Sequence, residues 1–176
     1  MSFDADLAAR ITALLRDVPD FPQPGVLFKD ISPLLADAAA FAAVVEALAR
    51  AGGGIDLVAG VEARGFLMAG AIATELGAGL VPVRKAGNLP PPTLARSYDL
   101  EYGSAEIEVP TGLLDGKRIL LVDDVLATGG TLRAAADLLT DAGATVTAMA
   151  VIVELGFLNG RALLGDTPPL VSLLTL

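Results

Sequence analysis

The feature that most constrains this chain is one continuous segment, residues 120–131, which reads LLVDDVLATGGT. The segment begins inside an apolar run, Ile119–Val122, which is typical of a fully buried parallel strand. Two adjacent carboxylates, Asp123 and Asp124, follow where the strand should leave the sheet, and a helical pattern begins at Leu132. Because ligands bind outside the carboxyl ends of strands in open α/β sheets, the segment predicts an α/β fold with a ligand site at the acidic pair.

The turn between the acidic pair and the helix predicts a phosphate site. A glycine-rich turn at a helix N-terminus supplies converging N–H groups and a favourable dipole, and threonine hydroxyls donate further hydrogen bonds. Carboxylates cannot bind phosphate, but they suit sugar hydroxyls or a magnesium ion. The simpler alternative is an ordinary βα unit whose Asp and Thr side chains only cap the helix. The residues of this glycine-rich turn are Ala127, Thr128, Gly129, Gly130 and Thr131.

Strand, acid pair, turn and helix in this order resemble the signature of the phosphoribosyltransferases that use 5-phosphoribosyl-1-pyrophosphate (PRPP). The resemblance implies that Asp123 and Asp124 lie against the ribose hydroxyls and that residues 127–131 hold the 5′-phosphate. It also implies Mg²⁺ as a cofactor, carried by PRPP and with Asp123 and Asp124 as further candidate ligands.

Composition excludes several kinds of chemistry. The chain of 176 residues has no Cys and no His, so disulfides, thiol nucleophiles and imidazole catalysis are impossible, and any general acid or base must be Asp, Glu, Lys or Tyr. Its net charge of -9 opposes binding to nucleic acid. Charged residues interrupt every apolar stretch before membrane-spanning length, and the first residues show no secretory signal. We therefore expect a cytoplasmic protein that binds neither nucleic acid nor membrane.

The pattern of elements predicts a single domain, residues 1–176, with a mainly parallel twisted sheet flanked by helices. The resemblance implies that residues 1–34 form an N-terminal hood that binds the acceptor base, and the three consecutive prolines at 90–92 predict a mobile loop plus hairpin over residues 86–110. The predicted helices span 3–17, 36–51, 65–76, 131–142 and 158–164, and the predicted strands span 55–61, 80–83, 97–100, 105–109, 117–122, 145–153 and 170–176.

Five further segments resemble the branch of this family that acts on adenine. They are residues 20–33, 60–66, 83–90, 97–103 and 172–174. The resemblance implies the type I phosphoribosyltransferase fold, a homodimer, and a reaction of adenine with PRPP that gives AMP and pyrophosphate.

Two loops are candidates for holding pyrophosphate. The segment Glu62, Ala63, Arg64 follows a buried strand and opens a helix, so it repeats the strand–turn–helix arrangement of the first anion site. An arginine can bind pyrophosphate in bidentate geometry, and Gly65 permits close backbone approach. Arg84 and Lys85 follow another strand end and add positive charge. The alternative is that Glu62 and Arg64 form an exposed ion pair that contributes little to stability.

The resemblance assigns the base to Leu27, Phe28 and Val125. Phe28 would stack on the purine, which is worth about 1–3 kcal/mol, or would only pack beneath a flap. The backbone at Leu27 would offer its N–H and C=O to adenine. A 6-oxopurine reverses both polarities, and mismatches of this kind cost selectivity of about 10⁴–10⁵.

The resemblance also places a catalytic glutamate at Glu101, beside Tyr102 on the same loop. Adenine must lose its N9 proton as it attacks C1′, and a loop carboxylate that closes over the site suits this role in a chain without histidine. A hairpin glutamate that faces water is the alternative.

Some residues depart from the pattern or favour one branch. Ala86 and Asn88 stand where many members of the family carry basic residues, which predicts a weaker hold on pyrophosphate. Ala127 replaces the aspartate typical of the hypoxanthine–guanine branch, which favours adenine over another purine base. A non-catalytic PRPP-binding regulator needs a basic face for nucleic acid, which the charge of -9 opposes. A regulatory protein that is phosphorylated on an aspartate would also place Asp after a strand, but it would not need the glycine-rich turn that follows here.

Overall fold

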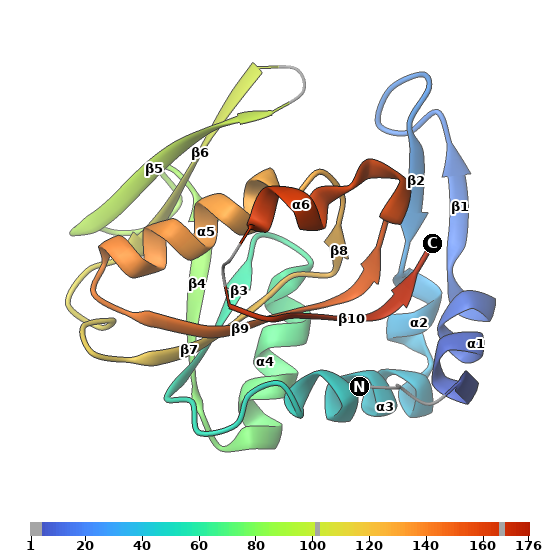
Figure 1. The fold of residues 1–176 in the computed structure, drawn as a ribbon, viewed down its shortest axis with the longest axis horizontal. Helices are drawn as coiled ribbons and strands as arrows, with labels where there is room; N and C mark the ends of the chain where they lie inside the picture. Colours follow the sequence, from blue (N-terminus) through green and yellow to red (C-terminus); the bar gives the residue numbers. More distant parts are fainter. Residues whose placement is uncertain (1–4, 101–102, 166–167) are drawn as a thin grey trace.

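The computed structural model describes residues 5–100, 103–165 and 168–176. Its main feature is a central sheet with the strand order β10-β9-β7-β3-β4-β6-β5 (Figure 1). The strands from β10 to β4 run parallel, whereas β6 pairs antiparallel with both β4 and β5. The strands are β3 (Leu57–Val61), β4 (Gly79–Lys85), β5 (Thr93–Leu100), β6 (Gly103–Pro110), β7 (Arg118–Val122), β9 (Thr145–Glu154) and β10 (Leu170–Thr175).

Helices cover both faces of the sheet. They are α1 (Ala5–Leu14), α2 (Ser32–Ala36), α3 (Ala38–Ala49), α4 (Gly65–Leu76), α5 (Gly130–Asp141) and α6 (Gly160–Leu164), with a short 3-10 turn at Gly156–Leu158. The first four helices contribute to one buried cluster, and α5 and α6 contribute to the other. Among the described residues, no helix is both long enough and apolar enough to cross a membrane.

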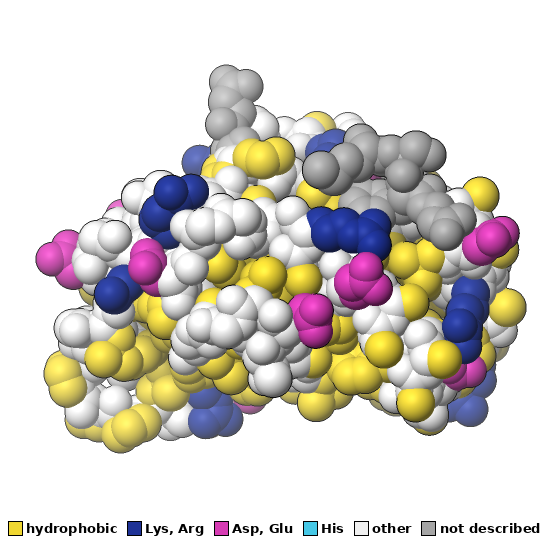
Figure 2. All heavy atoms as spheres, turned by 90° about the horizontal axis from the view of Figure 1, so that it is seen from below, with side chains coloured by type: hydrophobic (Ala, Val, Ile, Leu, Met, Phe, Trp, Pro, Cys, Tyr) yellow, Lys and Arg dark blue, Asp and Glu magenta, His cyan; other side chains and the backbone are white. Residues whose placement is uncertain are grey.

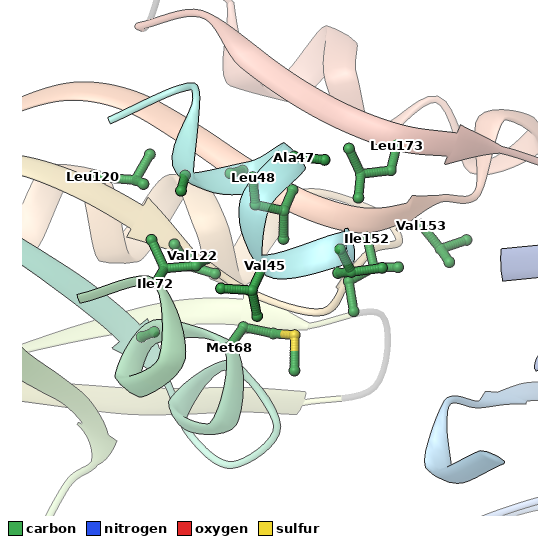
Figure 3. Packing of buried hydrophobic residues seen from close by; sticks show 14 of the residues in the cluster. Val45, Ala47, Leu48, Met68, Ile72, Leu120, Val122, Ile152, Val153 and Leu173 are labelled. Atoms are coloured by element: carbon green, nitrogen blue, oxygen red, sulfur yellow. The ribbon is translucent and has the colours of Figure 1, made fainter. Parts of the chain in front are cut away.

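The strand β7 shows why both faces are apolar. Leu120 and Val122 pack into the cluster of α3 and α4, as Figure 3 shows, while Ile119 and Leu121 pack into the cluster of α5. All four side chains are fully buried. Successive side chains of a strand point to opposite faces, so a strand covered on both sides is a continuous apolar run. The predicted mainly parallel sheet flanked by helices is confirmed.

A small two-stranded sheet stands apart from the central one. β1 (Arg16–Pro19) pairs antiparallel with β2 (Leu27–Asp30), and Figure 1 shows this pair at the opposite end of the molecule from the β5–β6 hairpin. The prediction of one helix over residues 3–17 was therefore wrong at its C-terminal end. Helical spacing continues as far as Leu15, but Arg16–Pro19 find backbone partners in β2, which local sequence does not reveal.

Other boundaries also differ from prediction. The predicted helix 36–51 is α3, which begins at Ala38 because the Asp37 side chain accepts a hydrogen bond from the Ala40 N–H at 2.8 Å and caps the helix. The short helix α2, which precedes it, was not predicted. The hairpin strands are longer than predicted and join the sheet through β4. An additional short strand, β8 (Val125–Leu126), pairs with β9.

Candidate active site

The acidic pair lies at the carboxyl end of β7 and is held by the backbone of β9. The Asp123 N–H donates to the Ala150 carbonyl at 3.1 Å, and the Asp124 carbonyl accepts from the N–H groups of Ile152 and Val153 at 3.0 and 3.1 Å. Asp124 is 5% exposed. The pair therefore lies at the carboxyl end of the parallel strands, and hydrogen bonds to the neighbouring strand β9 hold its backbone.

Burial and mutual repulsion perturb both carboxyl groups. Burial and then the neighbouring charge of Asp124 raise the pKa of Asp123 well above its ordinary value. Burial also raises the pKa of Asp124, although the guanidinium of Arg64 opposes this shift. Two adjacent buried carboxyl groups with raised pKa values are typical of a functional site, where a cation or hydrogen-bond donors such as sugar hydroxyls can bind them.

The glycine-rich turn has the predicted geometry. Gly129 precedes α5 with a positive φ of 89°, a conformation that glycine adopts without strain. A concavity is lined by Asp123 and residues 125–132, so Val125 and the turn share one surface with the acidic pair. The Thr131 hydroxyl lies 3.3 Å from that of Tyr98 on β5. Sequence reasoning missed Tyr98, because this contact joins residues far apart in the chain.

Arg64 connects three predicted parts of the site. Its Nε lies 2.9 Å from Asp124 Oδ2, its Nη1 donates to the Lys29 carbonyl at 3.1 Å, and its guanidinium lies 4.6 Å from the ring centroid of Phe28. The aromatic ring of Phe21 contacts Phe28 edge-on at 5.1 Å. The base segment, the loop 62–65 and the acidic pair are thus brought together by one side chain.

Close packing requires glycine at position 65, in addition to the predicted approach of a ligand. A Cβ at this position would lie 2.9 Å from the Val122 carbonyl oxygen and 3.1 Å from Asp123 Oδ1. Because real Cβ contacts are longer, a side chain here would push α4 away from the acidic pair. Glycine therefore lets the loop 62–65 and the acidic pair lie in direct contact.

Glu62 does not pair with Arg64. It accepts hydrogen bonds from Arg84 Nε at 3.2 Å, from the Lys85 N–H at 3.0 Å and from the Asn88 side-chain amide at 3.4 Å. The bond from Lys85 is the main reason why the pKa of Glu62 is lowered. The structure thus brings Glu62, Arg84 and Lys85 together beside Ala63. The Arg84 side chain already donates a hydrogen bond to Glu62.

Three further residues were predicted to contribute to the site. Leu27 lies on β2 and is 49% exposed. Glu101 and Tyr102 lie outside the described residues.

The comparisons with known proteins agree with one another. Residues 28–161 match the phosphoribosyl transferase domain family. The adenine phosphoribosyltransferase of Mycobacterium avium (strain 104) is 58% identical over 164 residues, which cover 92% of this chain and 91% of the relative. The crystal structure of adenine phosphoribosyltransferase from Rhodothermus marinus is 42% identical, with a TM-score of 0.94 over 98% of this chain and 100% of that one. The Saccharomyces cerevisiae enzyme, solved with an imino-altritol bisphosphate and adenine, is 36% identical, with a TM-score of 0.88 over 97% of this chain and 99% of that one.

Proposed function

Because this chain belongs to the phosphoribosyltransferase family, and within it to the adenine phosphoribosyltransferases, we propose that it converts adenine and PRPP to AMP and pyrophosphate. It is a pentosyltransferase of purine salvage: N9 of adenine forms a bond to C1′ of the ribosyl group, the bond from C1′ to pyrophosphate breaks, and adenine releases its N9 proton. The observation that links this reaction to the candidate site is the position of Arg64, whose side chain contacts Phe28, Lys29 and Asp124.

We propose that the acidic pair and the glycine-rich turn hold the ribosyl substrate. Carboxylates of Asp123 and Asp124 accept hydrogen bonds from the ribose hydroxyls, and charge-assisted bonds of this kind are stronger than neutral ones. The N–H groups of residues 128–131 and the Thr128 and Thr131 hydroxyls bind the 5′-phosphate at the N-terminus of α5. Support comes from the concavity that these residues line together.

For pyrophosphate, we propose that Arg64, Arg84 and Lys85 supply positive charge next to the departing group. Glu62 cannot donate to a phosphate, so its role is to hold Arg84 and the Lys85 backbone in place through the hydrogen bonds described above. The Ala63 backbone completes this loop. Arg84 must exchange at least one internal partner for the ligand, because its Nη1 also donates to the Asn88 carbonyl at 2.8 Å.

For the base, we propose that adenine stacks on Phe28, with Val125 nearby and with the Leu27 backbone as hydrogen-bonding partner. The planar guanidinium of Arg64 lies 4.6 Å from the Phe28 ring centroid, which supports the use of this ring as a stacking surface. Adenine offers an acceptor at N1 and a donor at N6, whereas an oxopurine reverses both. Discrimination by at least about a hundredfold follows from the unpaired groups that the wrong base would leave.

We propose Glu101 as the group that accepts the N9 proton, with Tyr102 beside it on the loop. The position of Glu101 follows from the resemblance of residues 97–103 to the family, and a carboxylate suits this proton transfer in a chain without histidine.

Magnesium fits this site as an ion that arrives with the substrate. In the described part of the chain, no group of three or more acidic side chains could hold a metal ion. Mg²⁺ needs only one or two carboxylates when substrate phosphates complete its shell. Asp124 Oδ2 is buried and forms an ion pair with Arg64 at 2.9 Å but accepts no hydrogen bond, so it keeps coordinating capacity. Asp123 and Asp124 are the candidate ligands. When bound, the ion would neutralise charge on the pyrophosphate.

We also propose a homodimer that acts in the cytoplasm. Figure 2 views the molecule from beneath α3 and α4 and shows a broad apolar surface with scattered charges. On α4 and β4, Leu67 and Leu80 are each about half exposed. Sedimentation equilibrium would measure the oligomeric state, and a monomer at micromolar concentration would contradict the dimer.

The experiment that tests the function is a direct assay of base specificity. The protein is incubated with PRPP and Mg²⁺ and, separately, with adenine, hypoxanthine, guanine or uracil, and the nucleotide formed is identified. We expect AMP from adenine, with the other bases at least about a hundredfold slower. Comparable rates with hypoxanthine would contradict the adenine assignment, and no nucleotide from any base would favour the non-catalytic PRPP-binding regulator.

A further inference from the structure

Two glycines from distant parts of the chain face each other behind the glycine-rich turn. Gly129 belongs to the turn, and Gly160 is the first residue of α6. A Cβ on Gly129 would lie 2.5 Å from the Gly160 carbonyl oxygen. A Cβ on Gly160 would overlap the Ala127 carbonyl oxygen and lie 2.9 Å from the Thr128 carbonyl carbon. The backbone of α6 thus lies directly on the backbone of the turn, with no side chain between them.

Neighbouring elements hold α6 firmly in this position. Arg161 binds both carboxylate oxygens of Glu154 at the end of β9, at 2.9 and 2.5 Å, and donates to the Leu170 carbonyl at 3.1 Å. Ser172 on β10 donates to the same carboxylate at 2.8 Å. Glu154 is buried, and bidentate arginine–carboxylate pairs are geometrically specific. The position of α6 is therefore determined by two strands of the central sheet.

The turn also has contacts with elements other than α6. β8, which leads into the turn, is tied to the end of β9 through the Leu155 N–H and the Leu126 carbonyl at 2.9 Å. Beyond Leu126, Ala127 packs against the cluster of the first four helices and the Thr131 hydroxyl lies 3.3 Å from that of Tyr98, while on the side of α6 the turn meets the Gly160 backbone. Because protein interiors are closely packed, a group that occupies one side of a loop limits the directions in which its N–H groups can point.

We propose that Gly160 is a positioning residue for binding of the 5′-phosphate. Its lack of a side chain lets α6 lie against residues 127–129, and this contact orients the N–H groups that receive the phosphate. The inference rests on the proposed function of the turn and adds a residue outside the acidic pair, the turn and the loops that bind pyrophosphate.

The consequence of adding one methyl group follows from these distances. In Gly160→Ala, the Cβ and the Ala127 carbonyl must separate by roughly 1 Å to reach normal contact. Both are backbone-anchored, so either the turn or α6 has to move. Displacement of even one phosphate donor weakens a charge-assisted hydrogen bond, and we expect AMP to bind at least about tenfold more weakly. Pyrophosphate binding should not change, because its proposed residues lie on the loop 62–65 and at the end of β4.

The experiment compares product inhibition in Gly160→Ala, in Gly53→Ala and in the unaltered protein. Gly53 is a matched control, because a Cβ there would meet nothing within 4 Å and its loop lies outside the proposed site. Inhibition by AMP and by pyrophosphate is measured against PRPP, together with the KM for adenine. We expect only the AMP constant, and the KM for PRPP, to rise in Gly160→Ala. A general loss of folding would weaken both inhibitors.

The outcomes separate the inference from the function on which it rests. If the unaltered protein makes no AMP, the proposed function fails. If it is active and Gly160→Ala binds AMP normally, or loses AMP and pyrophosphate binding equally, the positioning role is overturned. If circular dichroism shows that Gly160→Ala does not fold, Arg161→Lys takes its place, because lysine keeps the charge but cannot bind Glu154 in bidentate geometry. Arg161→Lys must then weaken AMP selectively; equal inhibition constants to the unaltered protein would refute the inference.

Discussion

Replacement of Arg64 by alanine should destabilise the folded protein strongly, because it leaves the carboxylate of Asp124 without its cation. The Arg64 Nε lies 2.9 Å from Asp124 Oδ2, and the two side chains are 33% and 7% exposed. Removal of one partner from a buried ion pair costs about 3–5 kcal/mol of unfolding free energy. Since Arg64 keeps a third of its side chain in water, we expect the smaller value of about 2–3 kcal/mol, which lowers the Tm by about 5–10 °C for a domain of this size.

The loss of stability should depend on pH in a defined direction. In the folded protein the pKa of Asp124 is raised above 3.8 by burial, and Arg64 opposes that shift. Arg64→Ala therefore raises the folded-state pKa further, so the folded state binds more protons than the unfolded state over a wider range above pH 3.8. Stability falls with rising pH wherever the folded state binds more protons. The variant should thus lose more stability at pH 8 than at pH 5.

Urea unfolding followed by circular dichroism at both pH values would test this reasoning. Arg50→Ala is a matched control, because Arg50 pairs with Glu46 at 2.9 Å but both side chains are more than half exposed. Exposed pairs of this type contribute only about 0.3–0.5 kcal/mol. The reasoning is refuted if Arg64→Ala costs no more than Arg50→Ala, or if its cost is the same at pH 5 and pH 8.

Four further substitutions test the proposed roles. Phe28→Ala should raise the KM for adenine by about five- to a hundredfold through lost stacking while leaving the KM for PRPP unchanged; steady-state kinetics with an equal rise for both substrates would contradict the assignment. Asp123→Asn and Asp124→Asn should each weaken PRPP binding by at least about tenfold, measured by calorimetry, and unaltered affinity would refute the placement of the ribose. Glu101→Gln should lower kcat by about 10²–10⁴-fold with PRPP affinity retained, and near-normal turnover would make this residue an ordinary surface charge.

Features that depend on neighbouring residues could be predicted from the sequence. The buried strand before Asp123, the glycine-rich turn and the start of α5 form one continuous strand–turn–helix unit, and each part has a clear residue signature. The elements built on periodicity, such as α4 and β9, were predicted for the same reason. Those that depend on a distant partner were not: β1 ends α1 early only because β2 lies beside it.

The partners of the site residues required the tertiary structure. Nothing near Glu62 in the chain indicates that it holds Arg84, Lys85 and Asn88 and leaves Arg64 to Asp124. Gly160 was missed for a similar reason, since a contact between two backbones has no residue-type signature beyond the glycine itself.

The sequence by itself therefore determined which chemical groups this protein can use. Its lack of histidine and cysteine, its acidic pair and its glycine-rich turn define the available ligands and donors, because side-chain chemistry is a property of each residue. The tertiary structure decided how those groups are charged and oriented. The pKa of Asp123 is raised only because folding buries it beside Asp124, and Arg64 reaches Phe28 and Asp124 only because packing of α4 against β7 brings their loops together. Burial and contact between distant residues are properties of the fold.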